Sequence, residues 1–145
     1  MAVTYDKIAF PKIEETIKHF LDSDFANVYI SPVFHMVGNE CICINLESST
    51  SETLATNFEV RLYNVSIKFC TKADMTKEQD NEYVKSRVDK LKKALIDNQV
   101  KSTSAKWAKL EVNDITYNVQ NEDIEDEDNL FMAELSVEVT NYNQF

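Results

Sequence analysis

Apolar residues occupy every second position over residues 130–140, and this period limits the folds open to the chain more than any other feature. The odd positions are all apolar: Phe131, Ala133, Leu135, Val137 and Val139. A period of two residues predicts a β-strand that buries one face against a core. The rest of the chain must therefore supply neighbouring strands and a second layer to cover that face.

The longest strand signal covers residues 57–70, where the apolar positions change parity. They are even-numbered first (Phe58, Val60 and Leu62) and odd-numbered later (Val65, Ile67 and Phe69). The change near Tyr63 and Asn64 predicts one of two arrangements. Either a β-bulge lies at that point, or the far half of the strand is buried on its other face.

A second change of parity occurs within residues 106–119. The apolar residues there are Ala108, Leu110 and Val112, followed by Ile115, Tyr117 and Val119. This pattern predicts a strand with a bulge near Asn113 and Asp114. Residues 41–46 predict another strand and residues 28–30 a short extended segment, whereas the serine- and threonine-rich residues 48–56 are expected to form a loop.

Two segments have helical periodicity. Residues 11–24 begin with Pro11, which suits a first helical turn, and carry one apolar stripe: Phe10, Ile13, Ile17, Phe20 and Leu21. Residues 76–97 form the second predicted helix, with Thr76 and Gln79 at the spacing of a capping box. Its buried stripe is Val84, Val88, Leu91 and Leu95, and its basic residues Lys85, Arg87, Lys90, Lys92 and Lys93 are expected to face water.

The order of these elements is helix, strands, helix, strands. This order predicts an α+β domain with an antiparallel or mixed sheet of about four to five strands packed against two main helices. With 145 residues and no internal repeat or linker, residues 1–145 are expected to form a single domain.

The composition excludes several functional classes. The formal net charge of -10 disfavours binding of DNA or RNA, which requires a surface rich in lysine and arginine. No run of about 18 apolar residues exists to span a membrane, and the first ten residues lack the features of a signal peptide, so we expect synthesis in the cytoplasm. Cys41, Cys43 and Cys70 have no redox or zinc-site spacing and are expected to be reduced, partly buried thiols.

Negative charge is concentrated in NEDIEDEDN, residues 121–129, between the last two predicted strands. This position predicts the turn of an antiparallel hairpin. The acidic residues are Glu122, Asp123, Glu125, Asp126, Glu127 and Asp128. Asp123, Glu125 and Glu127 alternate as calcium ligands can, but the loop lacks the glycine of a helix–loop–helix calcium site, so a solvated loop is the preferred interpretation.

No residue pattern points to catalysis. His19 and His35 are the only histidines and neither lies in a catalytic motif. Trp107 is more simply a core or interface anchor than a ligand platform. We therefore expect a protein that is not an enzyme and that binds no cofactor or metal.

The order of segments along the chain resembles the tail terminator (tail completion) proteins of long-tailed bacteriophages. The resemblance covers residues 8–142 and is carried by PKIEETIKHFL, VYISP, CICINLE, FEVRLYNVSIKF, YVKSRVDKLKKAL, KWAKLEVNDITYNV and FMAELSVEVTNY. The most telling part is the W-x-x-L-x-V-x-x-I-x-Y run, followed by the acidic turn and the closing strand. Because the family has no invariant catalytic motif, the resemblance assigns no site residue.

The resemblance implies a structural role in the virion. Tail terminators form a hexameric ring on the head-proximal end of the tail tube, where they stop tube polymerisation and contact a head completion or neck protein. DNA only passes through the ring. A negatively charged lumen would suit this passage, because like charges oppose adsorption.

A closed ring needs two different, complementary faces on each subunit. Charge segregation predicts that Lys90, Lys92 and Lys93 of one subunit meet an acidic surface of the next, with Glu122, Asp123 and Glu125–Asp128 as candidates. Two other functions stay open: a head–tail joining protein on the portal side, and a small ligand-binding or enzymatic α+β domain. A deep pocket with perturbed titratable groups would favour the latter.

Overall fold

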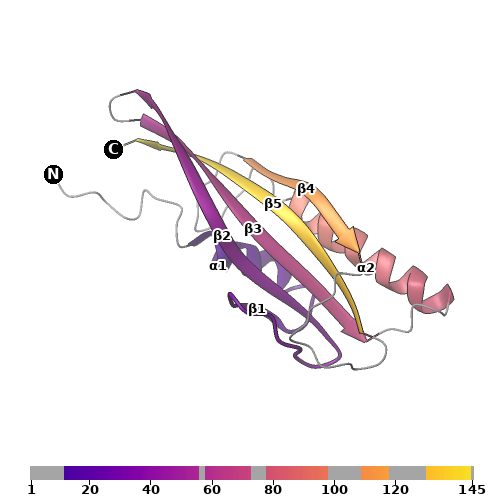
Figure 1. Ribbon diagram of the computed structural model, residues 1–145. Coiled ribbons are helices and arrows are strands. Elements are labelled where there is room, and N and C mark those ends of the chain that lie inside the picture. The colour runs from indigo at the N-terminus through magenta and orange to yellow at the C-terminus, as the bar shows by residue number, and fades with distance from the viewer. Residues whose placement is uncertain (1–11, 56–57, 73–77, 98–108, 118–129, 145) are drawn as a thin grey trace.

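The structure, a computed structural model, describes residues 12–55, 58–72, 78–97, 109–117 and 130–144. These residues form a five-stranded mixed sheet with two helices on one face (Figure 1). The elements are α1 (Lys12–Leu21), β1 (Val28–Ile30), β2 (Glu40–Ala55), β3 (Phe58–Lys72), α2 (Glu78–Asp97), β4 (Lys109–Tyr117) and β5 (Leu130–Gln144). The predicted α+β class is confirmed.

The strands lie in the order β1-β2-β3-β5-β4. Only the β1–β2 pair is parallel, and the three other pairs are antiparallel. Within the described residues, β1 and β4 are therefore the edge strands, and β3 lies at the centre with β2 and β5 along its length. The long strands β2, β3 and β5 run side by side beyond the helices towards the end where β5 finishes (Figure 1).

The prediction of a loop over residues 48–56 is wrong, because β2 continues to Ala55. Its serine- and threonine-rich half pairs residue by residue with β3, as in Ser49 with Tyr63 and Thr53 with Glu59. Serine and threonine are frequent in loops only as a correlation, and a segment without glycine or proline can complete a ladder when its partner strand is long.

The structure decides between the two arrangements predicted for residues 57–70. The register between β3 and β5 is continuous, so β3 has no bulge against β5. Tyr63 continues the buried set of Val65, Ile67 and Phe69 on the helix-covered face, and Val60 and Leu62 are partly buried on the other face. The register shifts lie in the β2–β3 ladder instead, between Leu46 and Ser48 and between Thr53 and Ala55.

The bulge predicted near Asn113 and Asp114 is confirmed. The register between β4 and β5 shifts between Val112 and Asp114, so Asn113 is the extra residue. The shift keeps Leu110, Val112 and Ile115 against the helix-side core. A bulge is the way in which a strand changes its apolar parity without changing face.

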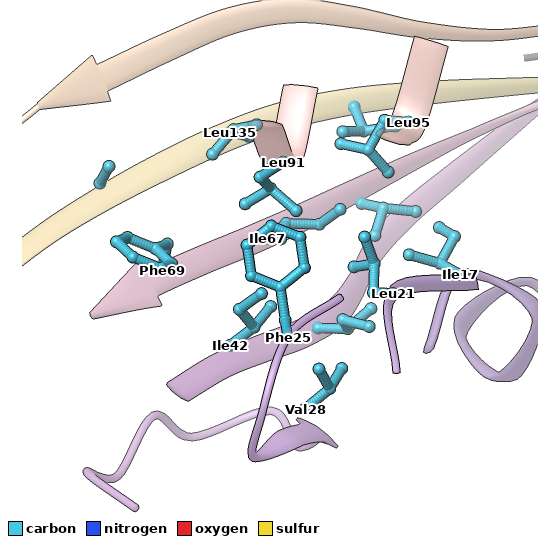
Figure 2. Packing of buried hydrophobic residues seen from close by; sticks show 14 of the residues in the cluster. Ile17, Leu21, Phe25, Val28, Ile42, Ile67, Phe69, Leu91, Leu95 and Leu135 are labelled. Atoms are coloured by element: carbon cyan, nitrogen blue, oxygen red, sulfur yellow. The ribbon is translucent and has the colours of Figure 1, made fainter. Parts of the chain in front are cut away.

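The core lies between the sheet and the two helices (Figure 2). The predicted stripe of α2, Val84, Val88, Leu91 and Leu95, is fully buried. From α1, Ile13, Ile17 and Leu21 pack beside it, and Phe25 lies among them just after the helix. The first helix is shorter than predicted, since it ends at Leu21 rather than at residue 24. No helix in the described ranges is long and apolar enough to cross a membrane.

Candidate assembly surfaces

The three lysines predicted to form an interface are exposed on α2, but their surroundings differ. Lys93 Nζ lies 2.8 Å from Asp97 Oδ2 one turn later on the same helix. Lys90 Nζ lies 5.9 Å from the ring centroid of Phe25, which links it to the loop after α1. Lys92 has neither contact, and among the described residues it forms no ion pair. Of the three lysines, Lys92 is therefore the one whose charge is most available to a neighbouring molecule.

Helical geometry places these lysines on different flanks of α2. At about 100° per residue, Arg87 and Lys90 fall on one side of the buried stripe, and Lys85, Asp89, Lys92 and Ile96 fall on the other. Arg87 and Lys90 both lie over Phe25, so the first flank faces α1. The second flank faces away from α1, on the side of β4, with which α2 packs. We call Lys85, Asp89, Lys92 and Ile96 the outer flank of α2.

The acidic residues Glu122, Asp123, Glu125, Asp126, Glu127 and Asp128 lie outside the described residues. The calcium ligands considered at three of these positions, and Trp107, lie there too. The strands on either side pair antiparallel, with Tyr117 opposite Ala133, as the predicted hairpin requires. The hairpin itself is supported, and the contacts of its acidic residues remain a prediction.

Three exposed acidic residues lie on α1 and β2, across the sheet from the outer flank of α2. Glu15 of α1 and Glu47 and Glu52 of β2 are all exposed. Glu14 is held more closely, because its Oε2 accepts a hydrogen bond of 3.0 Å from the backbone N–H of Leu46. Glu47 is the extra residue at the bulge that follows Leu46. The outer flank of α2 carries two lysines and one aspartate, and the three exposed glutamates lie towards the opposite edge of the sheet.

Arg87 was expected to face water with the lysines, and this prediction is wrong. Its Nη2 donates a hydrogen bond of 2.9 Å to Glu40 Oε2, and its guanidinium lies 4.5 Å from the Phe25 ring centroid. Tyr83 OH also donates to Glu40, over 3.1 Å. Burial and the nearby Glu40 raise the pKa of Tyr83. These contacts attach α2 to the first residue of β2 and have a structural role.

Titratable groups with perturbed pKa values gather on the face of the sheet opposite the helices. Cys41, Cys43, Cys70 and Met132 form a small cluster there with Phe34, and Tyr29, Met36 and Val37 pack against it. Burial raises the pKa of all three thiols, and that of Cys70 to about 12. Because the reactive form of cysteine is the thiolate, burial makes these thiols poor nucleophiles and poor metal ligands.

The histidines do not complete a catalytic group with this cluster. His19 is exposed on α1. His35 is exposed in the loop that covers the cluster, and its backbone N–H and C=O both bond to Tyr29 OH. In the described part of the chain, no group of three or more histidine, cysteine or acidic side chains is arranged to hold a metal ion.

The fold defines a class of protein: an α+β domain with two helices on one face of a mixed, mainly antiparallel sheet. In structure, the chain is similar to a chain of the virion of a native gene transfer agent particle. The TM-score is 0.65 at 10% sequence identity, over 88% of this chain and 92% of that chain, a likeness that shows a shared fold. No family profile matches the sequence, and no curated protein matches it.

Proposed function

We propose that this protein is a structural virion protein that caps the head-proximal end of a phage-type tail tube as a ring. In this role it stops tube polymerisation and provides the surface on which a head completion or neck protein docks. DNA passes through the ring without being bound specifically. The single observation that carries the proposal is the shared fold with a virion chain, which extends over 88% of this chain.

Two features of the molecule support an assembly role. The sheet carries two unequal edges, so that one copy can present a different surface on each side, as a closed ring requires. The exposed lysines of α2 also lie on the other side of the molecule from the exposed glutamates of β2, although α2 itself carries exposed acids. The thiols of Cys41, Cys43 and Cys70 are held neutral by burial, which supports a packing role for their cluster rather than chemistry there.

The net charge of -10 fits a ring through which DNA slides. Like charges keep the phosphate backbone from adsorbing to the lumen, and the effect extends over about 10 Å at moderate salt. The acidic residues 122–128 remain candidates for the lumen or for the subunit contact. We propose that the lysines of α2 meet an acidic surface of the neighbouring subunit.

The test is the mass of the purified protein by light scattering, alone and with tail tube protein, at low and moderate salt. We expect a ring of about six subunits, formed alone or only on tube ends, and tubes that stop growing when the protein is added. The variant with Lys90, Lys92 and Lys93 all changed to Glu should not form the ring. A protein that stays monomeric and leaves tube growth unchanged would overturn the proposal.

Mixing the protein with portal or head-adaptor rings as well as with tubes separates the tube-capping role from a role on the portal side. A protein that binds portal or head-adaptor rings and ignores tubes would be a head–tail joining protein. Electron microscopy of the mixtures distinguishes these outcomes, because the bound protein lies at the end of a tube in one case and on the portal in the other.

A further inference from the structure

The open edge of β2 begins at a definite residue. Before that point the edge is covered: Ile42 N–H donates to Asn27 O over 3.2 Å, and Ile44 O accepts from Ser31 N–H over 3.1 Å. The next outward N–H, that of Leu46, donates to Glu14. After Leu46, nothing in the described part of the chain pairs with the outer edge of β2.

The bulge at Glu47 determines which backbone groups point outward beyond Leu46. In an antiparallel ladder, alternate residues direct their N–H and C=O groups to the partner strand, and the others direct them away. Even-numbered residues of β2 point outward up to Leu46. Since Glu47 is an extra residue, Ser49, Ser51 and Thr53 point outward beyond it. We call the backbone groups of these three residues the arm edge.

The same alternation identifies the outward groups of β4, at the other side of the sheet. The partners Glu111, Asp114 and Thr116 face β5, because Glu138, Ser136 and Glu134 of β5 turn their backbone away from β3. The residues of β4 that point outward are Leu110, Val112, Ile115 and Tyr117. Tyr117 is 41% exposed, and Val112 and Ile115 are partly buried. We call the backbone groups of these four residues the β4 edge.

We propose that the arm edge of one copy pairs with the β4 edge of the next copy, so that the sheet continues from subunit to subunit around the ring. This inference rests on the proposed function and names the contact that closes the ring. β2 and β4 run in opposite directions, so a copy related by rotation presents them to each other as an antiparallel pair. A strand added to an open sheet edge satisfies backbone groups that otherwise face water.

Charge complementarity selects a second copy of this chain as the occupant. Alongside the β4 edge lies the outer flank of α2, with exposed Lys85 and Lys92 and with Ile96 at 42% exposure. Exposed Glu47 lies at the start of the arm edge, whereas Glu52 pairs with Val60 and points to the face opposite the helices. Pairing therefore brings the lysines of one copy towards Glu47 of the next. The contact is heterologous, as a closed ring requires.

The strand register within one copy also indicates how far neighbouring copies must be shifted relative to each other along the strands. Thr50, Leu62, Thr140 and Lys109 lie in one row, so the arm edge is level with the beginning of β4. Full pairing of the two edges requires the next copy to shift along the strand direction. Tilted and staggered strands are the geometry by which a sheet closes on itself.

The first experiment measures amide hydrogen exchange by NMR in the monomer and in the assembled ring. In the monomer, the amides of Ser49, Ser51 and Thr53 should exchange fast and those of Ser48, Thr50 and Glu52 slowly. In the ring all six should be protected. Fast exchange of Ser49, Ser51 and Thr53 in the ring would overturn the proposal.

The second experiment measures ring mass for two matched pairs of variants. Ser51→Pro removes one outward N–H, and an edge strand tolerates a proline at such a position. This variant should reduce ring formation at least tenfold. Ser51→Ala keeps the N–H and should assemble. Lys92→Glu should weaken the ring, whereas Lys93→Glu, on the same helix but off the outer flank, should not. Because Lys92 is exposed, its variant remains informative if Ser51→Pro does not fold.

The outcomes separate this inference from the proposed function. If the wild-type protein caps tubes as a ring and both Ser51→Pro and Lys92→Glu assemble normally, the edge contact is wrong and the capping role stands. If the wild-type protein forms no ring alone or on tubes, both are wrong.

Discussion

Arg87 of α2 and Glu40 at the start of β2 form an ion pair with a separation of 2.9 Å, and each side chain is only 18% exposed. The pair joins elements that are 47 residues apart in sequence, and Arg87 lies over Phe25 as well. It thus connects α2, the loop after α1 and the first strand of the long hairpin.

Arg87→Met should lower the free energy of unfolding by ~1–3 kcal/mol, because Glu40 then keeps its charge in a half-buried position without its partner. Methionine retains an apolar stem over Phe25, so the change tests the charge. A double-mutant cycle with Glu40→Gln, followed by urea unfolding, should show coupling of at least about 0.5 kcal/mol. Lys93→Met removes an exposed ion pair and should leave the urea midpoint nearly unchanged; equal effects of Arg87→Met and Lys93→Met would contradict this account.

Gly38→Ala should destabilise the protein by roughly 1–2 kcal/mol, because Gly38 has φ of +66°. A Cβ at this position would also lie 2.6 Å from Asn27 Nδ2, the atom that donates to Glu40 O. Thermal unfolding measures the loss. In an Asn27→Gly background the close contact is absent, so Gly38→Ala should cost less there; an undiminished cost would mean that the backbone conformation alone is responsible.

Stability should fall in alkaline solution because of Cys70. Burial raises the pKa of this thiol from its ordinary value near 9 to about 12. The unfolded chain therefore loses the proton first, so the contribution of Cys70 is complete below about pH 9 and is lost as the pH rises towards 12. The loss approaches about 1.4 kcal/mol per pH unit within that window. Urea midpoints at pH 8 and pH 10.5 should converge between wild type and Cys70→Ala; parallel curves would exclude Cys70 as the cause.

Tyr63→Phe should leave stability unchanged or raise it. Tyr63 is 1% exposed, and its buried hydroxyl has no hydrogen-bond partner in the part of the chain that the structure describes. An unpaired buried hydroxyl costs ~1–3 kcal/mol, and phenylalanine fills the same space without that cost. Calorimetry of both proteins measures the difference. A clear loss of stability would show that the hydroxyl has a partner in solution.

The sequence predicted those features of the fold that depend on local periodicity. The spacing of Val84, Val88, Leu91 and Leu95 was enough to define the buried face of α2. The change of parity around Asn113 located a bulge, because an edge strand with one buried face must insert a residue to change its parity. The order of elements also gave the class of fold.

The second half of β2 was not predicted as a strand, because its pairing is set by the length of its partner β3. Ser48 to Ala55 have the composition of a loop and become a strand only because β3 extends beside them. The position of the β2 bulge was also hidden, since the residues that follow it, Ser48 to Thr53, carry no apolar pattern whose parity could change. The absence of glycine and proline from residues 48–55 was the one signal of a strand there.

The candidate interface stays a prediction, and the structure shows only where its lysines lie on α2. Composition identifies the lysines of α2, but only the position of Phe25 after α1 shows that Lys90 lies on the flank towards α1 and Lys92 on the outer flank. Sequence reasoning missed Lys85 as a member of the same flank, although its spacing of seven residues from Lys92 was visible. Arg87 was misplaced because its partner Glu40 is distant in sequence.

The placement of β5 has a consequence for the order of folding. β5 follows β4 in the chain but lies between β4 and β3, so β4 has no partner strand until β5 is present. During synthesis the nascent chain can form the β2–β3 hairpin early, whereas β4 must wait, and long-range pairing of this kind is slow. An edge that is unavailable before the last strand has paired would keep unfinished chains out of a growing assembly.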